Sequence, residues 1–178
     1  MVGVSRETPQ ASLPDAAFRD DVGRIYTAEF SRLFRFLNRL TGDADRASDL
    51  VQEAFVRLHS RGSMPDEPSA WLVSVALNLF RNARTTDARR RRLLTPFRAE
   101  AVMADPTAAP GVALENADRR AQVRRILGRL SERDRQLLLL RAESYRYREI
   151  AAALDLKEES VGTLLARAKR AFMEASDQ

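Results

Sequence analysis

Apolar side chains recur at steps of three and four residues along much of this chain, which is the spacing of one face of an α-helix. The pattern predicts a first helix from Phe18 to Leu40 and a second from about Ala44 to His59. A loop rich in helix breakers, Ser60 to Pro68, follows, and Ser69 is expected to cap a third helix. Three helices therefore form the first expected domain.

The third helix has two unlike faces. Its apolar face, expected to lie in the core, comprises Trp71, Leu72, Val75, Ala76 and Leu79. Its polar face, expected to lie in solvent, comprises Ser74, Asn78, Arg81, Asn82 and Thr85. Arg84 and the run from Arg89 to Arg92 extend the basic character, and such a run is either a solvated helix end or a phosphate-binding surface. Amides next to guanidinium groups favour contacts with nucleic acid.

The stretch from Thr95 to Gly111 has no helical period. It contains three of the seven prolines, and no Lys or Arg occurs from Ala99 to Asp118. This composition predicts a linker. A second domain begins near Asp118, and a capping signal at Ser131 to Asp134 opens its second helix, which runs through Leu137 to Leu140. The apolar positions that mark its first helix are Val123, Ile126, Leu127 and Leu130.

Residues Tyr147 to Arg170 fit a helix-turn-helix. The small side chain of Ala151 allows the two helices to approach, and the ten-residue step to Val161 is the spacing that the motif requires. Asp155 stands where many such motifs have Gly, and Asp tolerates the left-handed conformation better than most residues. An ordinary helical hairpin is the alternative. The apolar positions of the pair are Ile150, Ala151, Leu154, Leu156, Val161 and Leu164.

The expected fold is therefore all-α, with a three-helix domain and a four-helix domain that contains the helix-turn-helix, joined by a flexible linker. Units of this size can each close a modest core. The expected boundaries are an N-terminal tail at 1–18, the first domain at 19–92, the linker at 93–117 and the second domain at 118–178.

Charge and composition narrow the function. The net charge is +5, with +4 in each of the two expected domains and −2 in the linker. This charge suggests a polyanionic partner, with a basic but otherwise inert surface as the alternative. There are no cysteines and one histidine, His59, so we expect no cofactor, no metal site and no enzymatic activity. The absence of a signal-like start and of a long apolar run predicts a cytoplasmic protein.

Three segments carry a family resemblance. The string from Asp49 to Leu58 resembles the polymerase-docking segment of bacterial sigma factors, and Ala70 to Leu79 resembles their promoter-melting helix. The motif from Tyr147 to Arg170 is similar to their C-terminal promoter-reading motif. With only these two domains, the chain resembles the extracytoplasmic-function (ECF) group of the sigma-70 superfamily over roughly residues 19 to 175.

The resemblance implies roles for three sets of residues. The set expected to grip the coiled-coil clamp of the largest polymerase subunit is Asp49, Gln52, Glu53 and Val56. A second set is expected to contact the melted minus-ten element, and the loop from Arg61 to Pro68 is expected to hold a base flipped out of that element. This set comprises Arg61, Ser63, Met64, Ser74, Asn78, Arg81, Asn82 and Thr85. The set expected to contact the minus-thirty-five element is Lys157, Glu159, Ser160, Gly162, Thr163, Arg167, Lys169 and Arg170.

The resemblance also implies partners. These are core RNA polymerase, including the flap of its second-largest subunit, promoter DNA and a cognate anti-sigma factor. The acidic linker would occupy the polymerase channel otherwise used by RNA, where carboxylates imitate phosphates. The expected function is that of an alternative sigma factor. A stand-alone helix-turn-helix regulator and a helical adaptor without a nucleic-acid role remain as alternatives.

The sequence departs from the family pattern in two places. Family members often carry Lys or Arg in the middle of the second helix of the motif, where this chain has Gly162, Thr163, Leu164 and Ala166. Contacts to DNA are then expected from Ser160 and Thr163, from the backbone at Gly162, and from phosphate clamps. Before the first helix of the motif, Tyr145 and Arg146 replace the usual small residues, and the sequence offers no reason for this change.

Overall fold

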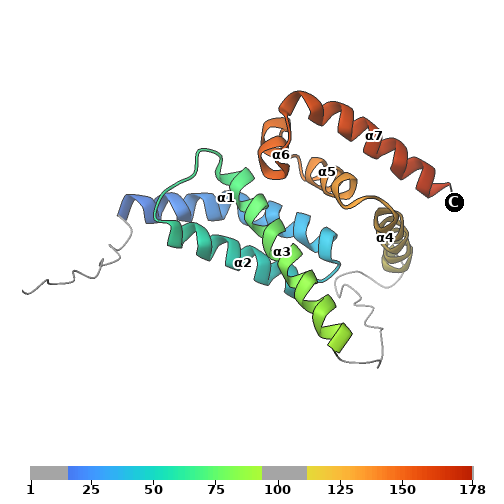
Figure 1. The fold of residues 1–178 in the computed structure, drawn as a ribbon, viewed down its shortest axis with the longest axis horizontal. Helices are drawn as coiled ribbons and strands as arrows, with labels where there is room; N and C mark the ends of the chain where they lie inside the picture. The colour runs from blue at the N-terminus through green and yellow to red at the C-terminus, as the bar shows by residue number, and fades with distance from the viewer. Residues whose placement is uncertain (1–15, 94–111, 178) are drawn as a thin grey trace, which may run out of the picture.

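The computed structural model describes residues 16–93 and 112–177, with side chains for 16–86 and 119–177. Within these ranges the chain forms helices and no strand, which confirms the all-α prediction. Most of the predicted linker lies outside the described residues. The helices are α1 (Ala16–Thr41), α2 (Ala44–Arg61), α3 (Pro68–Leu93), α4 (Val112–Arg129), α5 (Glu132–Ala142), α6 (Tyr147–Leu154) and α7 (Glu158–Ser176) (Figure 1).

Local capping interactions set the helix ends. The Asp43 side chain accepts a hydrogen bond from the Arg46 N–H and starts α2, and Ser131 caps α5 in the same way, as its sequence signal predicts. Helix α2 continues past the predicted end at His59 until Gly62, whose φ of 72° terminates it.

The predicted cap at Ser69 is wrong. Helix α3 begins one residue earlier, at Pro68, and the first helical hydrogen bond runs from the Trp71 N–H to the Glu67 carbonyl oxygen at 2.9 Å. Proline is well suited to the first position of a helix because the N–H that it lacks would have no helical partner there. Ser69 therefore lies inside the first turn.

The buried face of α3 is wider than the sequence predicts. Leu72 and Ala76 are buried as expected, but Trp71, Val75 and Leu79 are only partly buried. Helix α3 contacts α6 as well as α1 and α2, so more of its circumference is covered than a single domain would cover. The buried side chains of α3 that the sequence analysis did not assign to the core are Ala70, Val73, Leu77 and Phe80.

Helices α4 to α7 form the second domain. Helix α4 begins at Val112, earlier than the predicted start near Asp118. In the helix-turn-helix of α6 and α7, Ala151 and Val161 are buried and the Leu156 N–H bonds to the Ala151 carbonyl oxygen at 2.9 Å. Asp155 ends α6 with a φ of 54°, which confirms the predicted left-handed residue.

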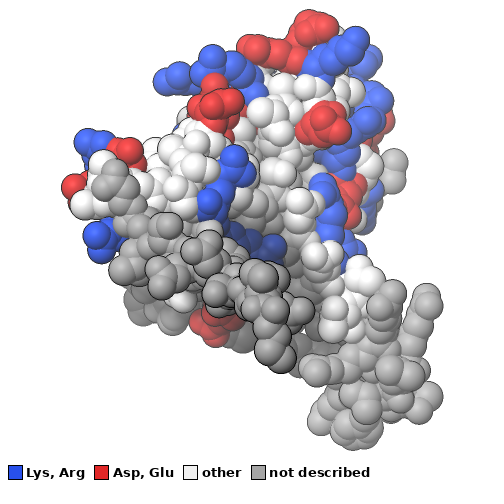
Figure 2. Space-filling view, turned by 60° about the vertical axis from the view of Figure 1, so that its left-hand side comes forward, with Lys and Arg blue, Asp and Glu red and all other residues white. Residues whose placement is uncertain are grey.

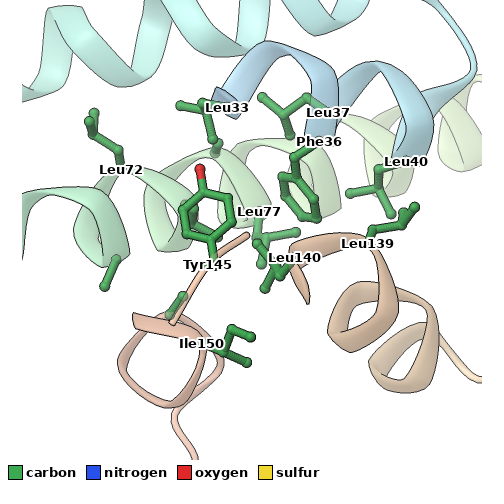
Figure 3. Close-up of a cluster of buried hydrophobic side chains, with 14 of the residues drawn as sticks. Leu33, Phe36, Leu37, Leu40, Leu72, Leu77, Leu139, Leu140, Tyr145 and Ile150 are labelled. Carbon is green, nitrogen blue, oxygen red and sulfur yellow. The ribbon is translucent and has the colours of Figure 1, made fainter. Parts of the chain in front are cut away.

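The two domains pack against each other and share one apolar core. Helices α1 and α3 contact α5 and α6, and the cluster of buried side chains continues from Leu33 in α1 to Leu165 in α7. Tyr145, in the segment between α5 and α6, points into this interface toward Leu33 and Leu77 and is almost completely buried (Figure 3). The preceding residue, Ser144, has a φ of 63°, so an unusual backbone conformation directs the chain here. This interdomain packing gives a structural role to Tyr145, one of the two residues that replace the family's usual small residues before α6.

The left-handed turn can be tested by substitution at Asp155. We predict that Asp155→Val lowers the free energy of unfolding by about 1–2 kcal/mol, because a β-branched side chain clashes with the backbone at positive φ. Asp155→Gly, the matched control, should be at least as stable as the original chain. Urea titration followed by far-UV circular dichroism measures both, and equal stability of the two variants would contradict the assignment.

Candidate functional site

The predicted docking set lies together on one face of α2. Asp49, Gln52, Glu53 and Val56 are all exposed, and the side chain of Val56 is 58% exposed although it is apolar. The contacts made by this face are local to the helix: Glu53 pairs with Arg57 at 2.9 Å. The opposite face of α2 packs on α1 and α3 through Leu50, Val51, Ala54, Phe55 and Leu58.

The loop between α2 and α3 presents only part of the predicted minus-ten set. Arg61 and Ser63 are exposed, whereas Met64 is partly buried and packs against the core. The Arg61 guanidinium carbon lies 5.8 Å from the centroid of the Trp71 ring, which itself packs against the core. Trp71 therefore acts mainly as a core residue with a cation beside it.

The polar face of α3 carries the rest of that set. Asn78, Arg81, Asn82 and Thr85 are exposed, and Ser74 is partly buried. The Arg81 guanidinium donates a hydrogen bond to the Asn78 side-chain oxygen at 3.0 Å, so these two groups are aligned along the helix. Arg81 also reaches across to the second domain, as described below.

The outer face of α7 carries the predicted minus-thirty-five set. Exposed members are Lys157, Glu159, Thr163, Arg167, Lys169 and Arg170, and partly buried members are Ser160 and Gly162. The ring of Tyr147, at the start of α6, lies 3.6 Å from the position that a Cβ atom on Gly162 would occupy. Tyr147 is 43% exposed and was not among the predicted site residues. An aromatic side chain therefore stands beside the backbone that was expected to approach DNA.

Arg167 also has a structural contact. Its guanidinium lies 3.3 Å from the carboxylate of Asp134, a buried residue at the start of α5. Asp134 in turn accepts a hydrogen bond from the Ser131 hydroxyl at 2.7 Å. Arg167 thus ties α7 to α5, in addition to the phosphate contact that the resemblance implies.

A charged cluster lies between the domains, around Arg32 of α1. The Arg32 guanidinium is 2.9 Å from the Glu149 carboxylate, 3.3 Å from that of Glu29, and donates a hydrogen bond to the Glu143 carbonyl oxygen at 3.2 Å. Its central carbon lies 3.5 Å from the centroid of the Tyr145 ring. One cation therefore contacts two carboxylates, a backbone carbonyl oxygen and an aromatic face at the interface.

Further pairs connect the same surfaces. The buried carboxylate of Glu143 pairs with Arg35 at 2.8 Å and with Arg39 at 2.7 Å, both on α1. At the other side of the interface, Glu132 of α5 lies 3.4 Å from Arg81 and 3.5 Å from Arg84. A separate pair joins the start of α6 to the loop before α3, with 2.6 Å between Arg148 and Glu67.

The environment fixes the charge of two interface groups. Burial alone would raise the pKa of Glu149, but the Arg146 N–H, which donates at 2.6 Å, and the Arg32 guanidinium hold that pKa below its usual value. Burial raises the pKa of the Tyr145 hydroxyl. At neutral pH the cluster therefore contains an ionised Glu149 and an uncharged Tyr145.

The face of the molecule shown in Figure 2 mixes both signs of charge among its described residues. Figure 2 shows basic and acidic residues interleaved over the coloured part of this face. Among the described side chains, no group of three or more His, Asp or Glu residues is arranged to hold a metal ion. None of the described helices is long and apolar enough to cross a membrane.

Family models match both halves of this architecture. Residues 25–91, which span most of α1 to α3, match sigma-70 region 2, and residues 120–172, which include the helix-turn-helix, match sigma-70 region 4. The chain therefore belongs to the sigma-70 family.

Curated relatives specify the type. The chain is 30% identical over 171 residues to the probable RNA polymerase sigma factor RfaY of Xanthomonas campestris pv. campestris, covering 92% of this chain and 41% of RfaY. It is 33% identical over 140 residues to the ECF RNA polymerase sigma factor SigJ of Mycobacterium tuberculosis, covering 75% of this chain and 44% of SigJ. The chain spans less than half the length of each of these relatives. With the two region matches, they identify it as an ECF member of the family.

A solved structure supports the same architecture. The fold is similar to that of the sigma factor RpoE of Bartonella quintana, which was crystallised with the anti-sigma factor NepR. The TM-score is 0.68 with 22% sequence identity, over 88% of this chain and 96% of that chain. At this identity the similarity concerns the fold, and it confirms the two-domain helical organisation.

The two roles of Arg167 can be separated by a stability measurement. We predict that Arg167→Ala lowers the free energy of unfolding by about 1 kcal/mol, because it leaves the buried Asp134 carboxylate with one partner fewer. The half-exposed position of Arg167 keeps the effect small. Arg170→Ala, at an exposed position of the same helix, is the matched control and should leave stability unchanged. Thermal unfolding distinguishes them, and equal midpoints would remove the structural role of Arg167.

Proposed function

We propose that this protein is an alternative sigma factor that binds core RNA polymerase and directs promoter recognition, promoter melting and transcription initiation. The observation that carries the proposal is the presence in one chain of sigma-70 regions 2 and 4, over residues 25–91 and 120–172. The protein then acts by binding in the cytoplasm and has no active site of its own. Polymerase supplies the nucleotidyl transfer and its magnesium.

The α2 face is the proposed contact with the clamp of the largest polymerase subunit. Its support is the combination of exposed acidic and amide groups with an exposed apolar side chain, Val56, since an apolar centre with a polar rim is typical of protein interfaces. The second domain would contact the flap of the second-largest subunit. The proposed contact residues on α2 are Asp49, Gln52, Glu53 and Val56.

The α3 face and the preceding loop are the proposed site for the melted minus-ten element. The exposed amides of Asn78 and Asn82 can hydrogen-bond to unpaired base edges, while Arg61 and Arg81 can contact phosphates. A base flipped into the loop would meet Ser63 at the surface and Met64 at the edge of the core. Ser74 and Thr85 complete the proposed strand-binding face.

Helix α7 is the proposed reading helix for the minus-thirty-five element. Thr163 and Ser160 offer hydroxyl groups near its N-terminus, Lys157 and Glu159 flank them, and Lys169 and Arg170 lie on exposed positions further along. A duplex that approaches Gly162 would also meet Tyr147. With so few groups suited to bidentate base contacts, phosphate contacts would supply most of the affinity.

A cognate anti-sigma factor is a further proposed partner. Its support is the fold similarity to a sigma factor that was crystallised with one. A stand-alone helix-turn-helix regulator would leave the region 2 match and the exposed α2 face without a role.

The docking proposal is tested by removing two side chains from the α2 face. We predict that Gln52→Ala with Glu53→Ala weakens binding to core polymerase at least about tenfold, a loss of about 1.4 kcal/mol, while helicity stays constant. Arg57→Ala is the matched control, because it breaks the same Glu53–Arg57 pair but keeps both proposed contact groups. Binding is measured by fluorescence anisotropy with labelled protein. Unchanged affinity in the folded double variant would remove the docking assignment.

The melting proposal is tested on the α3 face. Asn78→Ala with Asn82→Ala should slow promoter opening more than it weakens the initial closed complex, because the amides meet a strand that becomes available only on melting. Permanganate footprinting follows opening, and a gel shift at low temperature follows the closed complex. These asparagines are preferable to Arg81, whose loss would also break a pair with Glu132. Opening at the original rate would assign the face to ordinary solvated surface.

A further inference from the structure

The positive charge of the second domain is concentrated on α4 rather than on the proposed reading helix. Residues 119–129 contain five arginines and no acidic residue, whereas α7 has three basic and three acidic residues and therefore no net charge. One of the three basic residues of α7, Arg167, is paired with Asp134. Helix α7 therefore offers few free cations to DNA, and most of the positive charge of this domain lies elsewhere.

The arginines of α4 form two rows along its outer side. Arg120 and Arg124 are four residues apart, and so are Arg125 and Arg129, which places the members of each row about 6 Å apart along the helix axis. All four are exposed. Gly128 lies between the two rows by helical periodicity, and a Cβ atom there would meet nothing within 4 Å. The surface between the rows is therefore open.

The opposite side of α4 anchors the helix to the rest of the domain. Ile126 and Leu127 are buried, and α4 contacts α7. The Arg129 guanidinium donates a hydrogen bond to the Ala175 carbonyl oxygen at 3.1 Å, near the C-terminal end of α7 (Figure 1). Because each residue advances about 100° around a helix, Arg124 lies about 200° from Ile126. The outer rows are therefore a surface separate from the outer face of α7.

The two central arginines have no partner among the described residues. No ion pair or hydrogen bond engages Arg124 or Arg125 there. By contrast, Arg81 and Arg84 of α3 share the carboxylate of Glu132, at 3.4 Å and 3.5 Å. A guanidinium presents a planar fork of donors that matches the oxygens of a phosphate. Adjacent arginines on a face without acidic residues therefore favour a polyanionic ligand.

Duplex DNA suits this face better than a single strand does. Helix α4 carries no aromatic side chain on which unpaired bases could stack, and stacking is the usual contact of proteins with single strands. Rows of arginine reach phosphates, which a duplex displays along its whole length, and they need not read base edges. The proposed function also places duplex DNA against α7, which α4 contacts directly.

We propose that the outer face of α4 is a second DNA-binding surface of this domain, which contacts the phosphates of the duplex beside the minus-thirty-five element independently of sequence. The inference rests on the proposed function for the position of the DNA, and it adds a contact that this function does not assign. Arg124 and Arg125 are the central contacts, with Arg120 and Arg129 beside them. Helix α4 thereby supplies the electrostatic attraction that the uncharged α7 lacks.

The surface is tested first by removing two charges in the full chain. Arg124→Gln with Arg125→Gln should weaken binding to a mixed-sequence duplex of about 30 base pairs about tenfold, and should lower the salt slope by about 2, at about 0.9 per phosphate contact. Two unrelated sequences should show the same loss. Arg19→Gln with Arg24→Gln removes the same charge from exposed positions of α1 and should change the slope by less than about 0.5. Fluorescence anisotropy between about 50 and 200 mM salt measures all of these values.

A gain of charge provides a test that does not depend on lost side chains. Gly128→Lys places an ammonium group in the open space between the rows, so it should raise duplex affinity about threefold to tenfold and the salt slope by about 1. Gly128→Gln, which is similar in length and uncharged, is the matched control and should bind like the original chain. Both variants replace a glycine inside a helix, so neither should destabilise the fold.

The position of the DNA is mapped in the complex with core polymerase. The sequence has no cysteine, so Gln122→Cys, at an exposed position of α4, accepts a single iron chelate whose hydroxyl radicals cleave nearby DNA. On a promoter that the chain activates, this chelate should cut the backbone at positions different from those cut by the same chelate at Thr163→Cys on α7. Absence of cleavage from position 122 would overturn the contact.

The binding outcomes separate this surface from the proposed function. Equal duplex affinity of the Arg124/Arg125 variant and its α1 control, without a gain in Gly128→Lys, would overturn the α4 surface even if the chain directs transcription. A loss confined to single-stranded RNA, or to core polymerase without DNA, would also overturn it and would assign the face to RNA or to an acidic protein surface. The expected loss of duplex affinity in a chain that fails to direct transcription would support the α4 surface and contradict the proposed function.

Discussion

The interdomain contact of Tyr145 and Arg32 holds the domain of α1 to α3 against the domain of α4 to α7. Burying a side chain of this size contributes about 1.5–3 kcal/mol. Burying its hydroxyl without a partner among the described residues costs about 1–3 kcal/mol, so the two nearly cancel. The Arg32 guanidinium on the ring, held by the carboxylates of Glu149 and Glu29, adds to this contact. Apolar side chains fill most of the interface, and the charged cluster adds polar contacts between the domains.

The same contact links the fold to the family's architecture. Sigma-70 regions 2 and 4 occur here as two helical domains with a shared core, and α3 packs against helices of both domains. The interdomain packing leaves the α2 face and the outer face of α7 exposed, but it pairs Arg81 and Arg84 with Glu132. The proposed docking face and the proposed minus-thirty-five face are thus exposed, whereas part of the proposed minus-ten face is paired with the second domain.

Sequence reasoning succeeded where structure is set by local interactions. The Ser131 cap, the left-handed Asp155 and the ten-residue step from Ala151 to Val161 each depend on neighbouring residues, and each is present in the structure. It failed where the structure depends on residues far away in the sequence. The additional buried face of α3 is covered by α6, and the role of Tyr145, which departs from the family pattern, is explained by its contact with Arg32 of α1. Exposure of the docking face followed from helical periodicity. The pairing of Arg167 with Asp134 and the position of Tyr147 beside Gly162 needed the tertiary structure.

The proposed function requires that this chain give core polymerase a promoter specificity that polymerase lacks alone. The most direct measurement is in vitro transcription with core polymerase of the source bacterium on a library of its genomic promoters, with start sites mapped by sequencing. We predict a defined set of start sites that appear only when the chain is added and that share two upstream sequence elements. Binding of duplex DNA without polymerase, together with an unchanged set of start sites, would contradict it and favour a stand-alone regulator.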